Sequence, residues 1–337
     1  MRAAAWLAFS APLGFVALAA ACSRSELFFP PPEHDATAPD VAADVPEEPD
    51  VLEEPDAAVE DADADAAEED APPMIEETVD ICPDAGSTLI YLMTSQNVLM
   101  SFYPPTATFT AIGTIMCPDP GPNPSPFSMA VDRAGIAYVL FESGHLYRVS
   151  TRTAVCVPTK FVPGQTFPPQ FGMGFSANVT ADGGGDAGET LFIASDPGWP
   201  TQANPSSLGA LDTASFTATS MAPFTPVVRE PELTGTGAGR LYAFWAPSQS
   251  SATSIVEIDK DTSAVTTLAT LPGVVFGQGW AFAFWGGDFY TFTTPGPMDP
   301  SSIVTRYRPS DGTIVQVAST PNLTIVGAGV STCAPQM

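Results

Sequence analysis

The chain has 337 residues, 45% of them hydrophobic, and a formal net charge of −27 from 38 acidic and 11 basic residues. This apolar fraction is enough for a globular core. The acidic excess argues against a nucleic-acid partner, because binding to phosphate depends on Lys and Arg displacing counterions. The charge is uneven: residues 26–80 hold 21 acids and no Lys or Arg, whereas residues 81–337 hold 17 acids and nine bases.

Residues 1–21 are predicted to be a signal peptide, with Arg2 followed by an apolar stretch over residues 3–20. A proline and a glycine interrupt that stretch, which makes it a poor membrane span. The run Leu-Ala-Ala-Ala-Cys at 18–22 resembles a bacterial lipobox, although Ala19 stands where that motif most often has Leu. We therefore predict that Cys22 is lipidated and anchors the chain to a membrane. A cleaved signal with a free Cys22 and an uncleaved anchor are the alternatives.

Residues 22–80 are predicted to be a disordered acidic tether. Asp, Glu, Ala, Pro and Val dominate this segment, and like charges recur every two or three residues. Such a composition cannot bury enough apolar surface to offset the entropy of ordering. We interpret it as a solvated spacer, with calcium buffering by its carboxylates as the alternative.

Residues 81–337 are predicted to form an all-β domain. From Thr88 onward, short apolar stretches alternate with Gly, Pro, Asn, Asp and Ser, and no amphipathic helix of useful length is found. A unit recurs with starts near Phe127, Phe171, Leu233 and Gly279, at spacings of 44, 62 and 46 residues. Four short strands at a period near 45 residues are typical of a β-propeller blade.

Each unit opens with a strand that carries small residues at alternate positions and continues with an aromatic-rich strand. The predicted opening strands are Ser128–Val131, Gly172–Phe175, Gly235–Gly237 and Ala281–Phe284. Small residues suit the innermost strands of a narrow propeller, because these strands converge on the axis. A set of β-bulges is the alternative interpretation of the glycines.

The two ends of the domain complete each other. Residues 89–115 supply the second, third and fourth strands of a unit, and residues 325–330 have the alternation of the missing opening strand. Pairing these segments would remove two open sheet edges. We therefore predict a β-propeller of five four-stranded blades, in which the C-terminal strand completes the first blade and closes the ring.

Four cysteines remain in the domain, and they are Cys82, Cys117, Cys156 and Cys333. An even number in an exported protein predicts two disulfides, for which three connectivities exist. The blade layout favours a Cys82–Cys333 bridge that staples the ring, which leaves Cys117 to pair with Cys156. No CxxC spacing is present, so neither a zinc site nor any other metal or cofactor is predicted.

The candidate ligand-binding residues are aromatic and acidic side chains near the predicted inner strands and the longest insertion. They are Trp280, Trp285, Trp199, Asp132, Glu232 and Asp288. Exposed indoles suit sugar rings or another ligand with an apolar face, and core packing is the alternative for each one. Glycoside hydrolysis would need two of the acids to face one bond. No catalytic residue is assigned, since His145, the domain's one histidine, lies in an apparent turn and no nucleophile elbow is present.

Four segments resemble a group of predicted lipoproteins from myxobacterial genomes. They are Phe127–Arg133, Glu232–Gly237, Trp280–Phe289 and Ile325–Pro335, and the resemblance extends from about Gly86 to Pro335. It implies a β-propeller-like secreted domain at the outer membrane or cell surface, and it carries no known activity.

The leading interpretation is a non-catalytic binding or scaffold module, anchored by lipid in the cell envelope. We expect it at the outer membrane, on the periplasmic face or the cell surface, with a glycan or protein ligand. The alternative is an extracytoplasmic glycan-acting hydrolase that uses axial carboxylates, and a purely structural envelope role is a third hypothesis.

Overall fold

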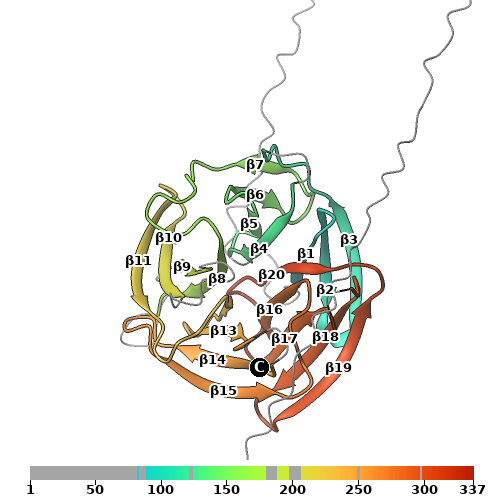
Figure 1. Cartoon of the computed structure of the whole chain (residues 1–337). Coiled ribbons are helices and arrows are strands. Elements are labelled where there is room, and N and C mark those ends of the chain that lie inside the picture. The colour runs from blue at the N-terminus through green and yellow to red at the C-terminus, as the bar shows by residue number, and fades with distance from the viewer. Residues whose placement is uncertain are drawn as a thin grey trace, which may run out of the picture. The chain divides into compact units, whose positions relative to one another are not determined.

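The computed structural model describes Cys82 and residues 89–120, 124–179, 188–196, 206–248, 251–296 and 298–337. These residues form five four-stranded antiparallel sheets arranged in a ring, which is a five-bladed β-propeller (Figure 1). The predicted fold is therefore confirmed. The predicted signal peptide and tether lie outside the described residues. In the described ranges, no helix has the length and apolarity to cross a membrane.

Blade 1 combines the two ends of the domain, and the other four blades follow in chain order from the inner strand outward. Blade 1 is β20 (Ile325–Gly329), β1 (Ile90–Thr94), β2 (Val98–Tyr103) and β3 (Thr108–Thr114), with the short 3-10 turn η1 (Pro104–Thr106) between β2 and β3. Blade 2 is β4 (Pro126–Val131), β5 (Ile136–Phe141), β6 (Leu146–Ser150) and β7 (Cys156–Pro158). Blade 3 is β8 (Phe171–Ala177), β9 (Glu189–Ser195), β10 (Ser207–Asp212) and β11 (Thr217–Pro223). Blade 4 is β12 (Glu232–Gly235), β13 (Leu241–Trp245), β14 (Thr253–Ile258) and β15 (Val265–Leu271). Blade 5 is β16 (Trp280–Trp285), β17 (Asp288–Thr293), β18 (Ser302–Arg308) and β19 (Thr313–Thr320).

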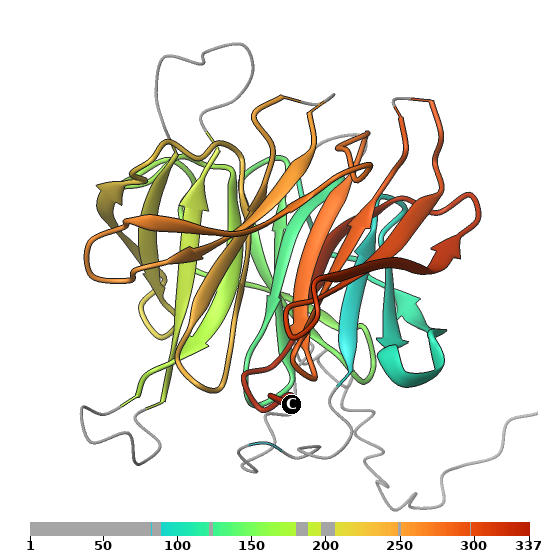
Figure 2. The same cartoon turned by 90° about the horizontal axis from the view of Figure 1, so that it is seen from below.

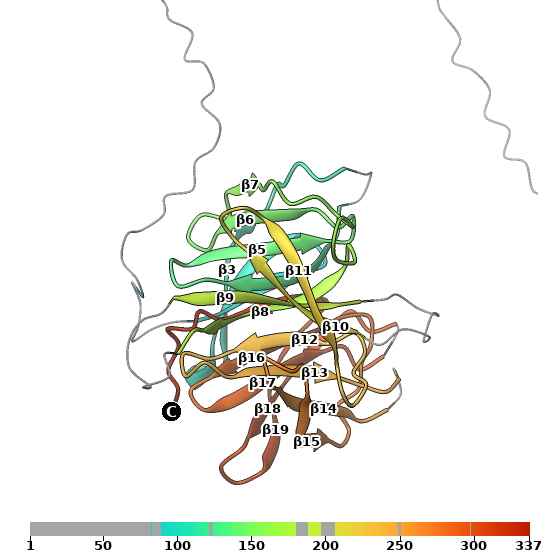
Figure 3. The same cartoon turned by 90° about the vertical axis from the view of Figure 1, so that its left-hand side faces the viewer.

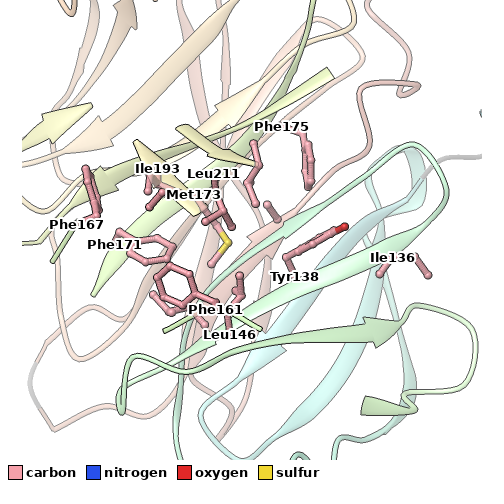
Figure 4. Close-up of a cluster of buried hydrophobic side chains, with 14 residues drawn as sticks. Ile136, Tyr138, Leu146, Phe161, Phe167, Phe171, Met173, Phe175, Ile193 and Leu211 are labelled. Atoms are coloured by element: carbon pink, nitrogen blue, oxygen red, sulfur yellow. The ribbon is translucent and has the colours of Figure 1, made fainter. Parts of the chain in front are cut away.

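Five apolar clusters hold the ring together, one between each pair of neighbouring blades. The cluster between blades 2 and 3 packs Tyr138 and Leu146 against Phe171, Met173 and Phe175 (Figure 4). The remaining clusters join blades 5 and 1, 1 and 2, 4 and 5, and 3 and 4. Each sheet therefore buries both faces, which explains why the second strands β5 (Ile136–Phe141) and β17 (Asp288–Thr293) are buried at every residue.

The ring closes where the C-terminal strand joins the first blade. Strand β20 pairs antiparallel with β1, with Gly329 opposite Tyr91 and Ala328 opposite Leu92. A disulfide between Cys82 and Cys333, 251 residues apart in the sequence, fastens the same seam. In the chain-entropy model a bridge over a loop of this length contributes about 5 kcal/mol.

The second disulfide joins blades 1 and 2. Cys117 follows β3 and Cys156 begins β7, and their Cα atoms are 5.3 Å apart. The favoured connectivity is thus the one that the structure contains.

Glycines in the inner strands make the narrow axis possible. A Cβ atom on Gly172 would overlap the carbonyl oxygen of Pro231, and one on Gly174 would lie 2.9 Å from the carbonyl carbon of Leu233. Between β4, β8, β12 and β20 the axial space does not admit a water molecule. The small residues therefore mark the axis, as predicted, and the axis is closed at its middle.

Two features differ from the sequence prediction. Strand β12 covers Glu232–Gly235, so Thr236 and Gly237 lie in the turn that follows, where the Thr236 N–H donates to the carbonyl of Arg240. The third and fourth strands of blade 3, β10 and β11, were expected from the four-strand unit but were not assigned to residues, because the long insertion before them obscures the period of the repeat.

The close backbone contact at the axis predicts that a methyl group added to an inner-strand glycine destabilises the fold. Gly172→Ala should lower the free energy of unfolding by about 3 kcal/mol or more, because the added Cβ meets the backbone of the next blade and cannot be relieved by a side-chain rotation. Gly296→Ala is the matched control, since a Cβ there meets nothing within 4 Å, and its effect should stay within about 1 kcal/mol. Urea unfolding curves measure both, and equal stabilities would contradict the crowded axis.

Candidate functional site

The two ends of the ring differ in what covers them. The inner strands begin at one end, here called the entry end, and finish at the other, here called the tail end, where the C-terminus lies (Figure 2). A third view shows the blades from the side of β11 (Figure 3).

The C-terminal residues after β20 pack across part of the tail end. Thr332 accepts a hydrogen bond from Nε of Arg133 at 2.8 Å, and the Pro335 carbonyl accepts one from the N–H of Gly286 at 2.8 Å. Cys82 also lies at this end, bound to Cys333 and with its N–H donating to the Arg133 carbonyl. The attachment of Cys82 therefore lies at the tail end, opposite the entry end.

A pocket of about 110 Å³ opens at the entry end, on the axis. This entry pocket is lined by side chains from four blades: Phe127 and Glu142 of blade 2, Glu232 of blade 4, Gln278 and Trp280 at the start of blade 5, and Val326 of blade 1. This volume is below the roughly 300 to 1,000 Å³ of sites for drug-sized ligands, so the pocket suits a small chemical group. Since the axis is closed below it, the pocket has a floor and is not the mouth of a channel.

Glu232 is the buried acid of the entry pocket. It is the first residue of β12 and only 4% exposed, and its Oε2 accepts a hydrogen bond from Ser128 Oγ at 2.9 Å. Burial raises the pKa of this carboxyl well above its usual range, the Ser128 hydroxyl opposes the shift, and the negative charge of Asp196 adds to it. A proton, or a cation from outside, is therefore favoured at this carboxylate.

Trp280 forms part of the wall beside Glu232. It is the first residue of β16 and pairs with Thr293 of β17, and its indole stacks on Phe276 with ring centroids 4.6 Å apart. The preceding Gly279 packs against the start of β20, where a Cβ would lie 2.8 Å from the Ile325 carbonyl oxygen. The indole is thus fixed by the sheet, by a second ring and by close backbone packing.

The other candidate residues do not join Glu232 and Trp280. Asp132 and Asp288 lie at the tail end, because both follow inner strands: Asp132 Oδ1 accepts from the Ile136 N–H at 2.8 Å. Asp288 pairs with Arg308 at 3.2 Å. Trp285 ends β16 and packs edge-to-face on Tyr103 at 6.2 Å, which fits its alternative role in core packing. Trp199 and Cys22 lie outside the described residues.

The sequence interpretation missed Glu142 and Gln278, which come from turns and not from strands. The signal that could have found them is strand direction. Residues just before an inner strand, and residues in the turn between the second and third strands, meet at the same end of a propeller.

His145 lies in the predicted turn at the edge of blade 2. Its Nδ1 is 3.1 Å from Ser143 Oγ and 3.7 Å from Asp119 Oδ1. One ring nitrogen faces both groups, so the set lacks the relay through opposite nitrogens that a catalytic triad requires. Across the described residues, no group of three or more His, Cys, Asp or Glu side chains could hold a metal ion.

Comparison with known proteins adds no assignment: no protein-family model and no curated protein matches the chain.

A second buried acid, Glu189, belongs to the tail end and was also missed by sequence. Its Oε1 accepts from the Arg133 N–H at 2.7 Å and its Oε2 from the Thr332 hydroxyl at 2.7 Å. Burial raises its pKa to about 7, while the hydrogen bonds from Thr332 and Arg133 and the Arg133 charge oppose the rise and the Asp132 charge adds to it. Glu189 thereby links blade 3 to blade 2 and to the C-terminal tail.

This raised pKa predicts a pH dependence of stability. Unfolding returns the Glu189 pKa toward 4.5, so the folded state holds the proton more tightly and its stability falls as the pH rises from about 4.5 through about 7. Between pH 5 and pH 8 the free energy of unfolding of Glu189→Gln should gain about 2 to 3 kcal/mol relative to wild type. Denaturant unfolding at both pH values measures the gain. Glu257→Gln, which removes an exposed acid paired with Arg240, should show a change below about 1 kcal/mol. If wild type and Glu189→Gln differed in free energy of unfolding by the same amount at pH 5 and pH 8, the raised pKa of Glu189 would be contradicted.

Proposed function

We propose that this protein is a lipid-anchored extracytoplasmic lipoprotein whose β-propeller binds a ligand in the entry pocket. The observation that carries the proposal is the convergence of Glu232 and Trp280, 48 residues apart in the sequence, in one pocket at the entry end of the axis. Binding sites in proteins are typically concave, apolar and supplied with a few polar groups, as this pocket is.

The anchor is proposed from the lipobox-like run that ends at Cys22 and the apolar stretch before it. The position of Cys82 indicates the end of the domain to which the acidic segment is attached. Because Cys82 is fastened at the tail end, the acidic segment before it joins the domain opposite the entry pocket. As a coil, its 58 residues would give a reach of roughly 40 Å, with the pocket on the end of the domain that faces away from the attachment.

Glycan hydrolysis is less well supported than binding. Two acids must flank one glycosidic bond, and Asp132 and Asp288 lie at the end opposite Glu232. Glu142 is the acid that shares the pocket with Glu232, and it is an exposed turn residue. We therefore propose a binding module and expect no product release from glycans.

Lipidation predicts a change of location. Cys22→Ser should move the protein from the membrane to the soluble fraction and abolish labelling by an alkyne fatty acid, because the thiol is the acceptor of the diacylglycerol group. Fractionation and immunoblotting of cells expressing each form measure this. Retention of the variant in membranes would overturn the anchor, and Cys333→Ser, which leaves the lipobox intact, should still be labelled.

The proposed site predicts that a substitution at the entry end weakens ligand binding and that substitutions at the tail end do not. On a glycan array, binding should be lost or reduced at least tenfold in Trp280→Ala, because the indole forms the pocket wall. Asp132→Asn and Asp288→Asn should bind as wild type does, since both side chains lie at the tail end. Binding that survives Trp280→Ala and fails in the Asn variants would place the site at the wrong end.

A further inference from the structure

We infer that the entry pocket takes an organic ammonium group, with Glu232 as its counter-charge and Trp280 as its aromatic wall. The inference rests on the proposed function of the pocket as a binding site, and it deepens that proposal by naming the ligand chemistry.

The first support is the isolation of Glu232 from positive charge. Buried acids are rare unless paired, because removing a carboxylate from water costs several kcal/mol. Two acids at the tail end obey this rule: Glu189 Oε2 lies 3.7 Å from Arg133 Nε, and Asp288 Oδ2 lies 3.2 Å from Arg308. Within the described ranges, Glu232 has the Ser128 hydroxyl as its hydrogen-bond partner, and the charge that perturbs it, from Asp196, is negative. A cation is thus the missing complement of this site.

The second support is the composition of the wall. The described lining residues include Glu142 as a second acid, the rings of Phe127 and Trp280, and neither Lys nor Arg. A cation over an aromatic face gains about 0.5 to 2 kcal/mol, most over indole and most where water is excluded. Carboxylate and aromatic groups on one small pocket thus favour an ammonium group over a neutral sugar or an anion.

The third support is a coupling between cation binding and the protonation of Glu232. Among the described residues, Asp196 after β9 acts on the charge of Glu232, and Glu142 in the turn after β5 lines the same pocket. Both are acids. Burial and Asp196 raise the pKa of Glu232, so at any pH below that pKa a bound cation must displace a proton from this carboxyl. Affinity for a permanent cation should therefore fall by up to tenfold per pH unit as the pH is lowered below the pKa of Glu232.

The experiment compares charged and neutral probes of the same shape. Choline is paired with 3,3-dimethylbutan-1-ol, and n-butylammonium with n-butanol, each titrated into the purified full-length protein by isothermal calorimetry and ligand-observed NMR. We expect at least one of the two cations to bind with a Kd near 1 mM, its neutral partner to bind at least tenfold more weakly, and the binding of choline to weaken from pH 8 to pH 5.

Substitutions test whether Glu232 supplies the negative charge that binds the cation. Glu232→Gln should weaken cation binding at least tenfold at pH 8 and remove its pH dependence. Glu189→Gln is the matched control, a buried acid at the opposite end, and should bind as wild type does. The pH series uses the wild-type protein, so it tests the proposal even if Glu232→Gln folds poorly.

The failures are distinguishable. Equal binding of charged and neutral probes, no binding of either cation, or full binding by Glu232→Gln would overturn the ammonium site. Trp280-dependent binding that is confined to uncharged glycans would overturn it as well, while sustaining the proposed function. The proposed function would instead be contradicted if the ligands found on the array bound Trp280→Ala as strongly as they bind wild type.

Discussion

Five strands that converge on one axis leave no room for side chains between them, and the rest of this structure depends on that limit. At Gly172 and Gly235 a single methyl group would overlap the backbone of the neighbouring blade. Glycine is a poor strand former, so it is retained here for space and not for propensity. The close approach of the backbones closes the axis at its middle, and the two ends of the ring consequently become separate surfaces.

The same geometry makes the chain ends interdependent. A blade that lacks its inner strand would expose the hydrogen-bonding edge of β1, and β20 supplies that strand from more than 200 residues away. The seam is fixed by its apolar cluster, by the Cys82–Cys333 disulfide and by Glu189, Arg133 and Thr332. The tail end therefore carries the disulfide of the seam and acids that are paired with arginine. At the entry end lies Glu232, a buried acid that has no positive partner in the described chain. This difference in charge pairing is one ground on which we propose the entry end as the ligand-binding end.

Much of the architecture could be predicted because its causes are local in the sequence. Alternating small residues reveal the inner strands, and the truncated first unit reveals the composite blade. The site was only half predictable. Glu232 and Trp280 flank strands that the pattern identifies, but Glu142 and Gln278 lie in turns whose meeting depends on how blades are arranged in space. Asp132 and Asp288 were grouped with Glu232 because all three adjoin inner strands. Two of them follow a strand and one begins it, so they lie at opposite ends.

The central claim, that residues 325–329 are the inner strand of the first blade, is tested most directly by hydrogen exchange of the chain with and without residues 325–337. In the full chain the amides of Tyr91 and Met93, which face β20, should exchange only with global unfolding. In a chain that ends at Thr324, the account predicts that the β1 amides lose this protection by at least a hundredfold, together with the neighbouring seam against β16 and β17. Unchanged protection of β1 in the shortened chain would contradict the closed ring.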